Sequence, residues 1–155
     1  MIAQGPLLDS RPPSTNIRER GLDAVENDME RGGHILVIDD EEPILELLRD
    51  ILTDGGHTVV TALSGREALV ALKDELFDLV FTDVGMPDMT GWDVCRHVHD
   101  MRPSLPVVLI TGWGSSVTSQ ETDEAGVAAV IGKPFQVDEL LAKTEKILEG
   151  RSLRR

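Results

Sequence analysis

The chain has 155 residues, which is enough for one domain with a hydrophobic core plus a tail and too few for two domains of ordinary size. Its 28 acidic residues against 15 basic ones argue against nucleic-acid binding, because phosphate backbones are held by clustered Lys and Arg. No apolar stretch approaches the roughly 20 residues of a membrane span, and the single cysteine excludes an internal disulfide framework, so we expect a soluble, cytoplasmic protein without membrane contact.

Residues 1–33 differ in composition from the rest of the chain. They begin with a stretch rich in proline and small polar residues, and the part that follows has few apolar positions at helical spacing. We therefore expect an N-terminal leader that is disordered to weakly helical over residues 1–33, one domain over residues 34–149 and a short basic tail over residues 150–155.

From His34 onward, short apolar runs alternate with amphipathic stretches. The apolar runs are rich in β-branched residues and predict buried strands at 34–38, 57–63, 78–82, 106–111 and 127–132. The stretches between them predict helices at 43–52, 64–76, 91–101, 115–126 and 136–150. Strands that are apolar on both faces and alternate with helices favour an α/β fold with a parallel sheet covered on both sides.

Helical spacing also predicts which side chains face the core. The expected inward positions are Ile44, Leu47, Leu48 and Ile51 in the first helix and Ala68, Leu69 and Leu72 in the second. Cys95 is expected to pack as a small core residue. The fourth helix offers only Val117 and Ala125 as clearly apolar inward positions, which predicts low local stability.

Polar side chains follow or end four of the five predicted strands. Asp39 and Asp40 follow the first, Asp83 the third and Lys133 the fifth, while Thr111 ends the fourth. Right-handed crossovers place the carboxyl ends of all strands at one edge of the sheet, where ligands of such sheets bind. Either Asp39 or Asp40, taken alone, would more often cap the following helix, and only the coincidence of all five residues at one edge favours a site.

Three carboxylates at one edge repel each other unless one is protonated or a cation lies among them, and Lys133 alone does not neutralise all three. Oxygen ligands favour Mg²⁺, or Mn²⁺ in its place, and Mg²⁺ is commonly completed by a phosphate oxygen. Carboxylates can accept phosphoryl groups as acyl phosphates. The pattern therefore indicates phosphoryl chemistry, with Thr111 as hydrogen-bond donor and Lys133 as counter-charge.

The chain resembles the receiver domain of two-component response regulators, of the single-domain CheY-like kind, in four segments that occur in this order: VIDDEE, FTDVGMPDMTGW, VVLITG and VIGKPF. The resemblance covers residues 34 to about 149. It implies a flavodoxin-like (βα)5 doubly wound sheet of five parallel strands in the order 2-1-3-4-5. It also implies that Asp83 accepts a phosphoryl group from a histidine kinase or phosphotransfer protein.

The same resemblance implies further roles at the site. Asp40, Asp83 and the backbone carbonyl of Gly85 would hold Mg²⁺, with Asp39 acting through a water molecule. Thr111 and Lys133 would bind the phosphoryl oxygens and couple phosphorylation to a change of the surface that docks an unknown downstream protein. The chain would be a phosphoacceptor that assists its own phosphorylation and dephosphorylation rather than an enzyme.

Three positions depart from the common receiver pattern. Val130 stands three residues before Lys133, where receivers often carry Tyr or Phe, so a simple aromatic rotamer switch is not expected. Gly85 leaves little side-chain cover over the acceptor, and Trp113 either supplies that cover, faces a partner or packs on the fourth helix. We expect residues 112–125 to be the region that rearranges.

Two other functions share parts of this pattern. A Mg²⁺-dependent phosphatase with an Asp nucleophile typically has a second Asp two residues later, where this chain has Gly85. A phosphorylation-independent adaptor would keep the fold alone, but every expected acid, the Thr and the Lys are present. The tail is too short for an output domain, so the protein is expected to dock to a partner, relay phosphate or form part of a longer chain such as a hybrid kinase.

Overall fold

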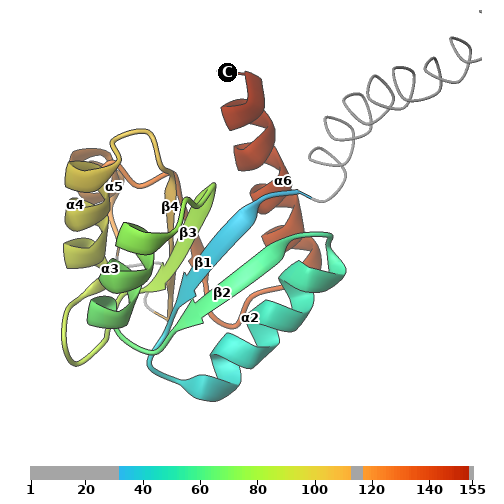
Figure 1. Ribbon diagram of the computed structural model, residues 1–155, viewed down its shortest axis with the longest axis horizontal. Coiled ribbons are helices and arrows are strands. Elements are labelled where there is room, and N and C mark those ends of the chain that lie inside the picture. Colours follow the sequence, from blue (N-terminus) through green and yellow to red (C-terminus); the bar gives the residue numbers. More distant parts are fainter. Residues whose placement is uncertain (1–31, 113–116, 154–155) are drawn as a thin grey trace, which may run out of the picture. The chain divides into compact units, whose positions relative to one another are not determined.

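A computed structural model describes residues 32–112 and 117–153, with side chains described as far as residue 150 (Figure 1). Five parallel strands form one sheet in the order β2-β1-β3-β4-β5, which confirms the predicted flavodoxin-like α/β fold. The strands are β1 (His34–Ile38), β2 (Thr58–Ala62), β3 (Leu79–Asp83), β4 (Val107–Thr111) and β5 (Ala129–Gly132). Residues 1–31 of the predicted leader and Trp113 lie outside the described residues.

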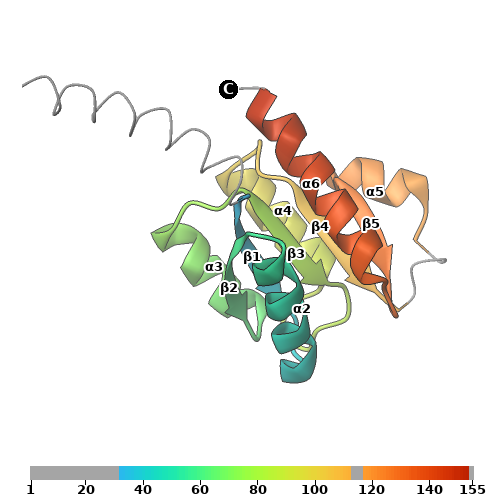
Figure 2. The same cartoon turned by 90° about the vertical axis from the view of Figure 1, so that its right-hand side faces the viewer.

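The helices cover both faces of this sheet (Figures 1 and 2). They are α2 (Glu42–Asp54), α3 (Gly65–Asp74), α4 (Gly91–Met101), α5 (Ser119–Ala125) and α6 (Val137–Leu153). Successive strand residues point to opposite faces, so β1 sends Ile35 and Val37 into the core layer with α2 and α6, and Leu36 and Ile38 into the layer with α3 and α4. The sheet is therefore buried on both sides, as its continuous apolar strands predict.

Side-chain caps mark the starts of three helices. Ser64 accepts a hydrogen bond from the Glu67 backbone N–H at the start of α3, and Thr90 and Thr118 form capping boxes at the starts of α4 and α5. Helix α2 begins after Glu41 with a proline in its first turn and no side-chain cap. Neither Asp39 nor Asp40 is therefore used as an N-cap.

The buried stripe of α2 differs from the predicted one. Leu48 and Ile51 are buried as expected, but Leu47 is 47% exposed, and the core takes Leu45 and Leu52 instead. The helix is also longer than predicted. Its buried face is shifted by about one residue along the sequence, because contacts with the sheet and α6 select among adjacent apolar positions.

The other expected core positions fall mostly as predicted. Ala68, Leu72 and Cys95 are fully buried, and Leu69 packs partly buried against the same cluster.

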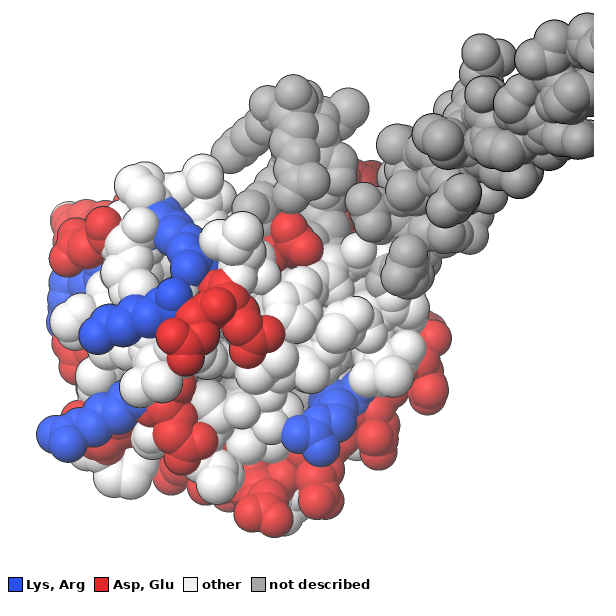
Figure 3. All heavy atoms as spheres, in the orientation of Figure 1, with Lys and Arg blue, Asp and Glu red and all other residues white. Residues whose placement is uncertain are grey.

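Carboxylates gather along the exposed face of α2, where acidic side chains recur at every fourth position (Figure 3): Glu42, Glu46, Asp50 and Asp54. Within the described ranges, no helix combines the length and the apolar composition needed to cross a membrane.

Candidate functional site

Three carboxylates meet at the carboxyl ends of β1 and β3, which are neighbouring inner strands of the sheet. Asp39 and Asp40 follow β1, Asp83 ends β3, and one oxygen atom from each side chain lies within 4.8 Å of the others. Asp39 is 1% exposed, the Asp83 side chain is 12% exposed and Asp40 is exposed. The cluster thus reaches from the interior to the surface, which leaves one side open to solvent.

Lys133 places its ammonium among these acids from the loop after β5. Its Nζ donates to Asp39 Oδ2 at 3.0 Å and to Asp83 Oδ1 at 3.2 Å, and lies 3.9 Å from Glu41 Oε2. The backbone N–H of Lys133 donates to the Thr111 carbonyl at 2.9 Å, and its peptide bond to Pro134 is cis. One ammonium therefore faces more carboxylates than it can neutralise.

The pKa shifts of Asp83 and Lys133 follow from this geometry. Burial raises the pKa of the Asp83 carboxyl, and the charge of Asp39 raises it further, while Lys133 opposes both effects. Burial would lower the pKa of Lys133, but its hydrogen bonds and attraction to Asp39 and Asp83 prevail and raise that pKa. The ammonium is therefore firmly charged, and the site retains excess negative charge.

Thr111 and Gly85 flank the cluster. Thr111 is buried at the end of β4, where it lies opposite Gly132 and one position beyond Ile110, the strand partner of Asp83. Gly85 is exposed, two residues past Asp83 in the loop between β3 and α4. The structure thus places Thr111 and Gly85 at the same sheet edge as the acids.

Val130 lies away from the acids, within β5. It is partly buried, and its carbonyl accepts a hydrogen bond from Lys143 Nζ at 3.2 Å. A cavity of about 620 Å³ lies elsewhere, beside Leu105 and Lys146, and none of the clustered acids lines it.

Two acids near the site carry contacts that sequence reasoning did not assign. Glu41, the residue after the acid pair Asp39 and Asp40, lies within ion-pair distance of Lys133. Asp88, in the loop after β3, accepts hydrogen bonds from the first two backbone N–H groups of α3. The position of Glu41 next to Asp39 and Asp40 could have indicated its contact with Lys133. No local pattern could have indicated the hydrogen bonds of Asp88, because its partners are more than twenty residues away in sequence.

The donor set fits a hard divalent cation. All side-chain candidates are carboxylates, and the oxygens around an octahedral Mg²⁺ lie about 3–4 Å apart, which matches a cluster whose oxygens are within 4.8 Å of one another. The exposed side at Asp40 leaves space for the water molecules that Mg²⁺ usually retains. The arrangement can therefore hold a metal ion at its solvent-exposed side, beside Asp40.

Known proteins share both the sequence pattern and the fold. The family model described as the response regulator receiver domain matches residues 35–145. The transcriptional regulatory protein GlrR of Escherichia coli K12 is 35% identical over 116 residues, which cover 75% of this chain and 26% of that protein. The chain thus spans about a quarter of the length of this curated relative.

Two solved structures illustrate the structural likeness. A CheY-like receiver domain protein from Methanospirillum hungatei has a TM-score of 0.75 and 31% identity, over 80% of this chain and 99% of that one. The response regulator TrrA from Thermotoga maritima, solved in complex with Mg²⁺ and BeF, has a TM-score of 0.69 and 32% identity, over 74% of this chain and 98% of that one. Together with the matched residues, these findings show that the chain belongs to the family of response regulator receiver domains.

Proposed function

We propose that residues 34–149 form a receiver that accepts a phosphoryl group on Asp83 from a histidine kinase or phosphotransfer protein in a cytoplasmic two-component system. The observation that carries this proposal is the convergence of Asp39, Asp40 and Asp83, two of which, Asp39 and Asp83, accept hydrogen bonds from the ammonium of Lys133. This cluster combines a carboxylate that solvent can reach with ligands for a divalent cation. Family membership supports the same assignment.

Asp83, Asp40 and the Gly85 carbonyl would hold Mg²⁺ directly, Asp39 would act through water, and Mn²⁺ would serve in place of Mg²⁺. The bound ion supplies positive charge that lowers the repulsion between the carboxylates and an incoming phosphoryl group. The buried carboxylate of Asp39 also fixes the position of Lys133, through the hydrogen bond at 3.0 Å.

In the transfer step an Asp83 carboxylate oxygen attacks phosphorus. The P–N bond to the donor histidine breaks as the O–P bond forms, and the imidazole leaves with its electron pair. Lys133, which bridges Asp39 and Asp83 before transfer, then binds a phosphoryl oxygen, and the Thr111 hydroxyl binds another. Because Thr111 ends β4, its movement would be passed to the segment leading into α5.

The output of the chain is part of the same proposal. Because position 130 is a valine, the conformational change that follows phosphorylation would pass through Thr111 and α5 rather than through an aromatic side chain in β5. The relative GlrR is a transcriptional regulator of which this chain spans 26%. A downstream protein that docks on the changed surface is the partner we infer, with no nucleic acid or membrane bound by this domain.

Incubation with acetyl phosphate and Mg²⁺, followed by intact mass measurement, tests the proposal. The wild-type chain should gain one phosphoryl group, and omission of Mg²⁺ should abolish the gain. Asp83→Asn should not be phosphorylated, because an amide is not a competent nucleophile here. Asp50→Asn, which changes an exposed carboxylate on α2, is the matched control and should react like the wild type. An acyl phosphate that forms equally fast on Asp83→Asn would refute the assignment.

A further inference from the structure

Helix α3 is held at its N-terminus by a residue from another part of the chain. Asp88 accepts the Gly65 N–H on Oδ1 at 3.3 Å and the Arg66 N–H on Oδ2 at 3.0 Å. These N–H groups lack partners within the helix, and a carboxylate there also complements the helix dipole. Asp88 therefore ties the loop between β3 and α4 to the start of α3.

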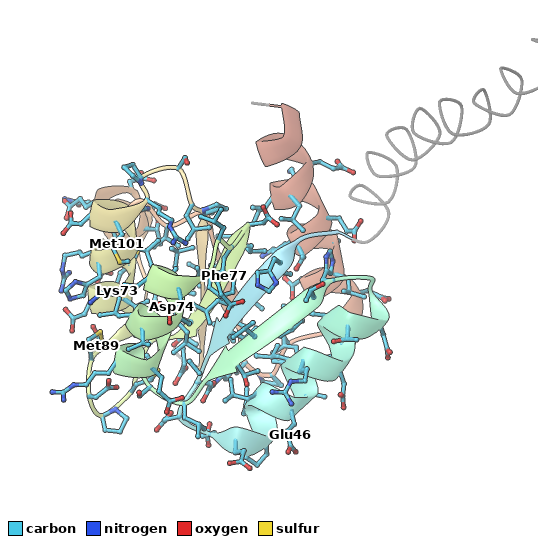
Figure 4. All side chains as sticks on the ribbon, viewed as in Figure 1. Glu46, Lys73, Asp74, Phe77, Met89 and Met101 are labelled. Carbon is cyan, nitrogen blue, oxygen red and sulfur yellow. The ribbon has the colours of Figure 1, made fainter. Side chains whose placement is uncertain are left out.

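Packing fixes the same loop at two points. Gly65 is buried against Met89, and a Cβ at that position would collide with the methionine side chain, which lies beside α3 in Figure 4. The Gly91 N–H donates to the Val84 carbonyl at 2.9 Å, and a Cβ at Gly91 would collide with the Asp83 carbonyl. The loop over residues 84–90 is thus closed at its base and anchored near its tip.

We propose that Asp88 is a positioning residue for the metal site. Its two hydrogen bonds hold the loop so that the Gly85 carbonyl, three residues away, stays beside the three carboxylates. This inference rests on the proposed function, which assigns that carbonyl to the metal. Without the anchor, binding of the ion would also have to order the loop, and that entropy cost lowers affinity.

The carboxylate of Asp88 is ionised at neutral pH. Burial acts to raise its pKa, but hydrogen bonds from the Arg66, Gly65 and Met89 backbone N–H groups together lower the pKa below its ordinary value. An ionised carboxylate forms stronger hydrogen bonds to N–H groups than a neutral amide does. Asn at this position retains one acceptor oxygen and should keep part of the anchor.

Two other contacts of α3 provide matched controls. Ser64 accepts the Glu67 N–H at the N-terminus, and Arg102, at the end of α4, donates to the Glu75 and Leu72 carbonyls at the C-terminus. Both stabilise the same helix, and these side-chain hydrogen bonds go to α3 and its C-cap rather than to the loop over residues 84–90. Their removal reports what a loss of helix stability alone does to the metal site.

The test is a Mg²⁺ titration of the full chain, followed by NMR chemical shifts, with thermal unfolding in EDTA as a second measurement. Asp88→Ala should raise the dissociation constant for Mg²⁺ about tenfold, which corresponds to the cost of ordering roughly one more backbone residue on binding. Asp88→Asn should lie between Asp88→Ala and the wild type. Ser64→Ala and Arg102→Ala should lower the melting temperature while leaving the dissociation constant unchanged.

The outcomes separate this inference from the function on which it rests. If the wild type does not bind Mg²⁺, the proposed metal site is wrong and the role of Asp88 is wrong with it. If the wild type binds Mg²⁺ and both Asp88 variants bind it equally tightly, Asp88 has no positioning role although the site stands. The same conclusion follows if Ser64→Ala weakens binding as much as Asp88→Ala, because the effect then comes from helix stability.

Discussion

At the scale of single residues, Lys133 links the acids of this site. Its ammonium donates to Asp39 and Asp83, which end neighbouring strands and would otherwise repel each other. The side chain is 19% exposed, so water screens these interactions only in part. The lysine therefore supplies one positive charge beside the carboxylates and would compete with a metal ion for the same oxygens.

Replacement of Lys133 should separate its effect on the stability of the fold from its effect on Mg²⁺ affinity. In EDTA, Lys133→Met should lower the free energy of unfolding by about 1–3 kcal/mol, because the clustered carboxylates lose their counter-charge. The same variant should bind Mg²⁺ more tightly, by roughly three- to tenfold, because a competing cation is gone. Unfolding by urea and a Mg²⁺ titration measure these changes.

Lys143→Met is the matched control, since Lys143 contacts the Val130 carbonyl and Glu139 rather than the acid cluster. It should leave Mg²⁺ affinity as in the wild type. Weaker Mg²⁺ binding by Lys133→Met would contradict the competition between the ammonium and the metal ion.

At the scale of elements, α4 and α5 differ in how firmly they are attached. Helix α4 buries Val94, Cys95 and Val98, and the Cys95 thiol donates to the Ala125 carbonyl at 3.1 Å. Helix α5 has seven residues and none of them is buried, although Thr118 and Glu121 form a capping box and Gly126 ends the helix at a φ of 73°. Its stability therefore comes from its ends and not from burial, as its few apolar residues predict.

This difference leads to a prediction for hydrogen exchange. Amides of α5 should exchange at least about tenfold faster than those of α4, because little burial opposes local opening. Addition of Mg²⁺ and beryllofluoride, which mimics a phosphoryl group, should slow exchange in α5 and leave α4 unchanged. Hydrogen exchange followed by mass spectrometry measures both, and α4 is the internal control. Slow exchange in α5 that the mimic does not alter would contradict its role as the mobile element.

At the scale of the whole molecule, one buried histidine connects three parts of the domain. His57 directly precedes β2 and is 5% exposed. Its Nδ1 accepts a hydrogen bond from the Gly33 N–H at 3.1 Å. Its Nε2 lies 3.4 Å from a carboxylate oxygen of Glu145 in α6, without the geometry of a hydrogen bond. Gly32 has a φ of 76° and adjoins the ring so closely that a Cβ would collide with it. Burial lowers the pKa of His57, and Glu145 offsets this only in part.

The stability of the domain should therefore depend on pH through His57. Its pKa in the unfolded chain is about 6.5, so below that pH the unfolded state binds more protons than the folded state. The stability from neutral His57 is complete above about pH 6.5 and decreases as pH falls towards the lower folded-state pKa. At pH 8, His57→Asn should cost about 1–2 kcal/mol, since Asn keeps an acceptor for the Gly33 N–H but loses ring packing.

The gap in unfolding free energy between the wild type and His57→Asn should narrow as pH falls below 6.5, because only the wild type loses the contribution of a neutral His57. Urea unfolding at a series of pH values measures it. The other three histidines are common to both proteins, so their titration cancels in the difference. A gap that stays constant from pH 8 to pH 5 would show that His57 is not perturbed.

The sequence by itself determined the alternation of strands and helices, the burial of the sheet on both faces and the placement of acids after β1 and β3. These features depend on local periodicity and on the rule that the carboxyl ends of parallel strands share one edge. The motifs around Asp39, Asp83 and Lys133 also indicated the family, because they combine residue types in one order and spacing.

Only the tertiary structure decided which contacts these residues make. Lys133 reaches Asp39 across 94 positions and Asp83 across 50, a pairing set by the strand order. The choice of Leu45 over Leu47 for the core of α2 depended on packing against the sheet, because helical periodicity allows both positions. The tie from Asp88 to α3 likewise joins segments that are distant in sequence, and its local sequence carries no sign of the helix it holds.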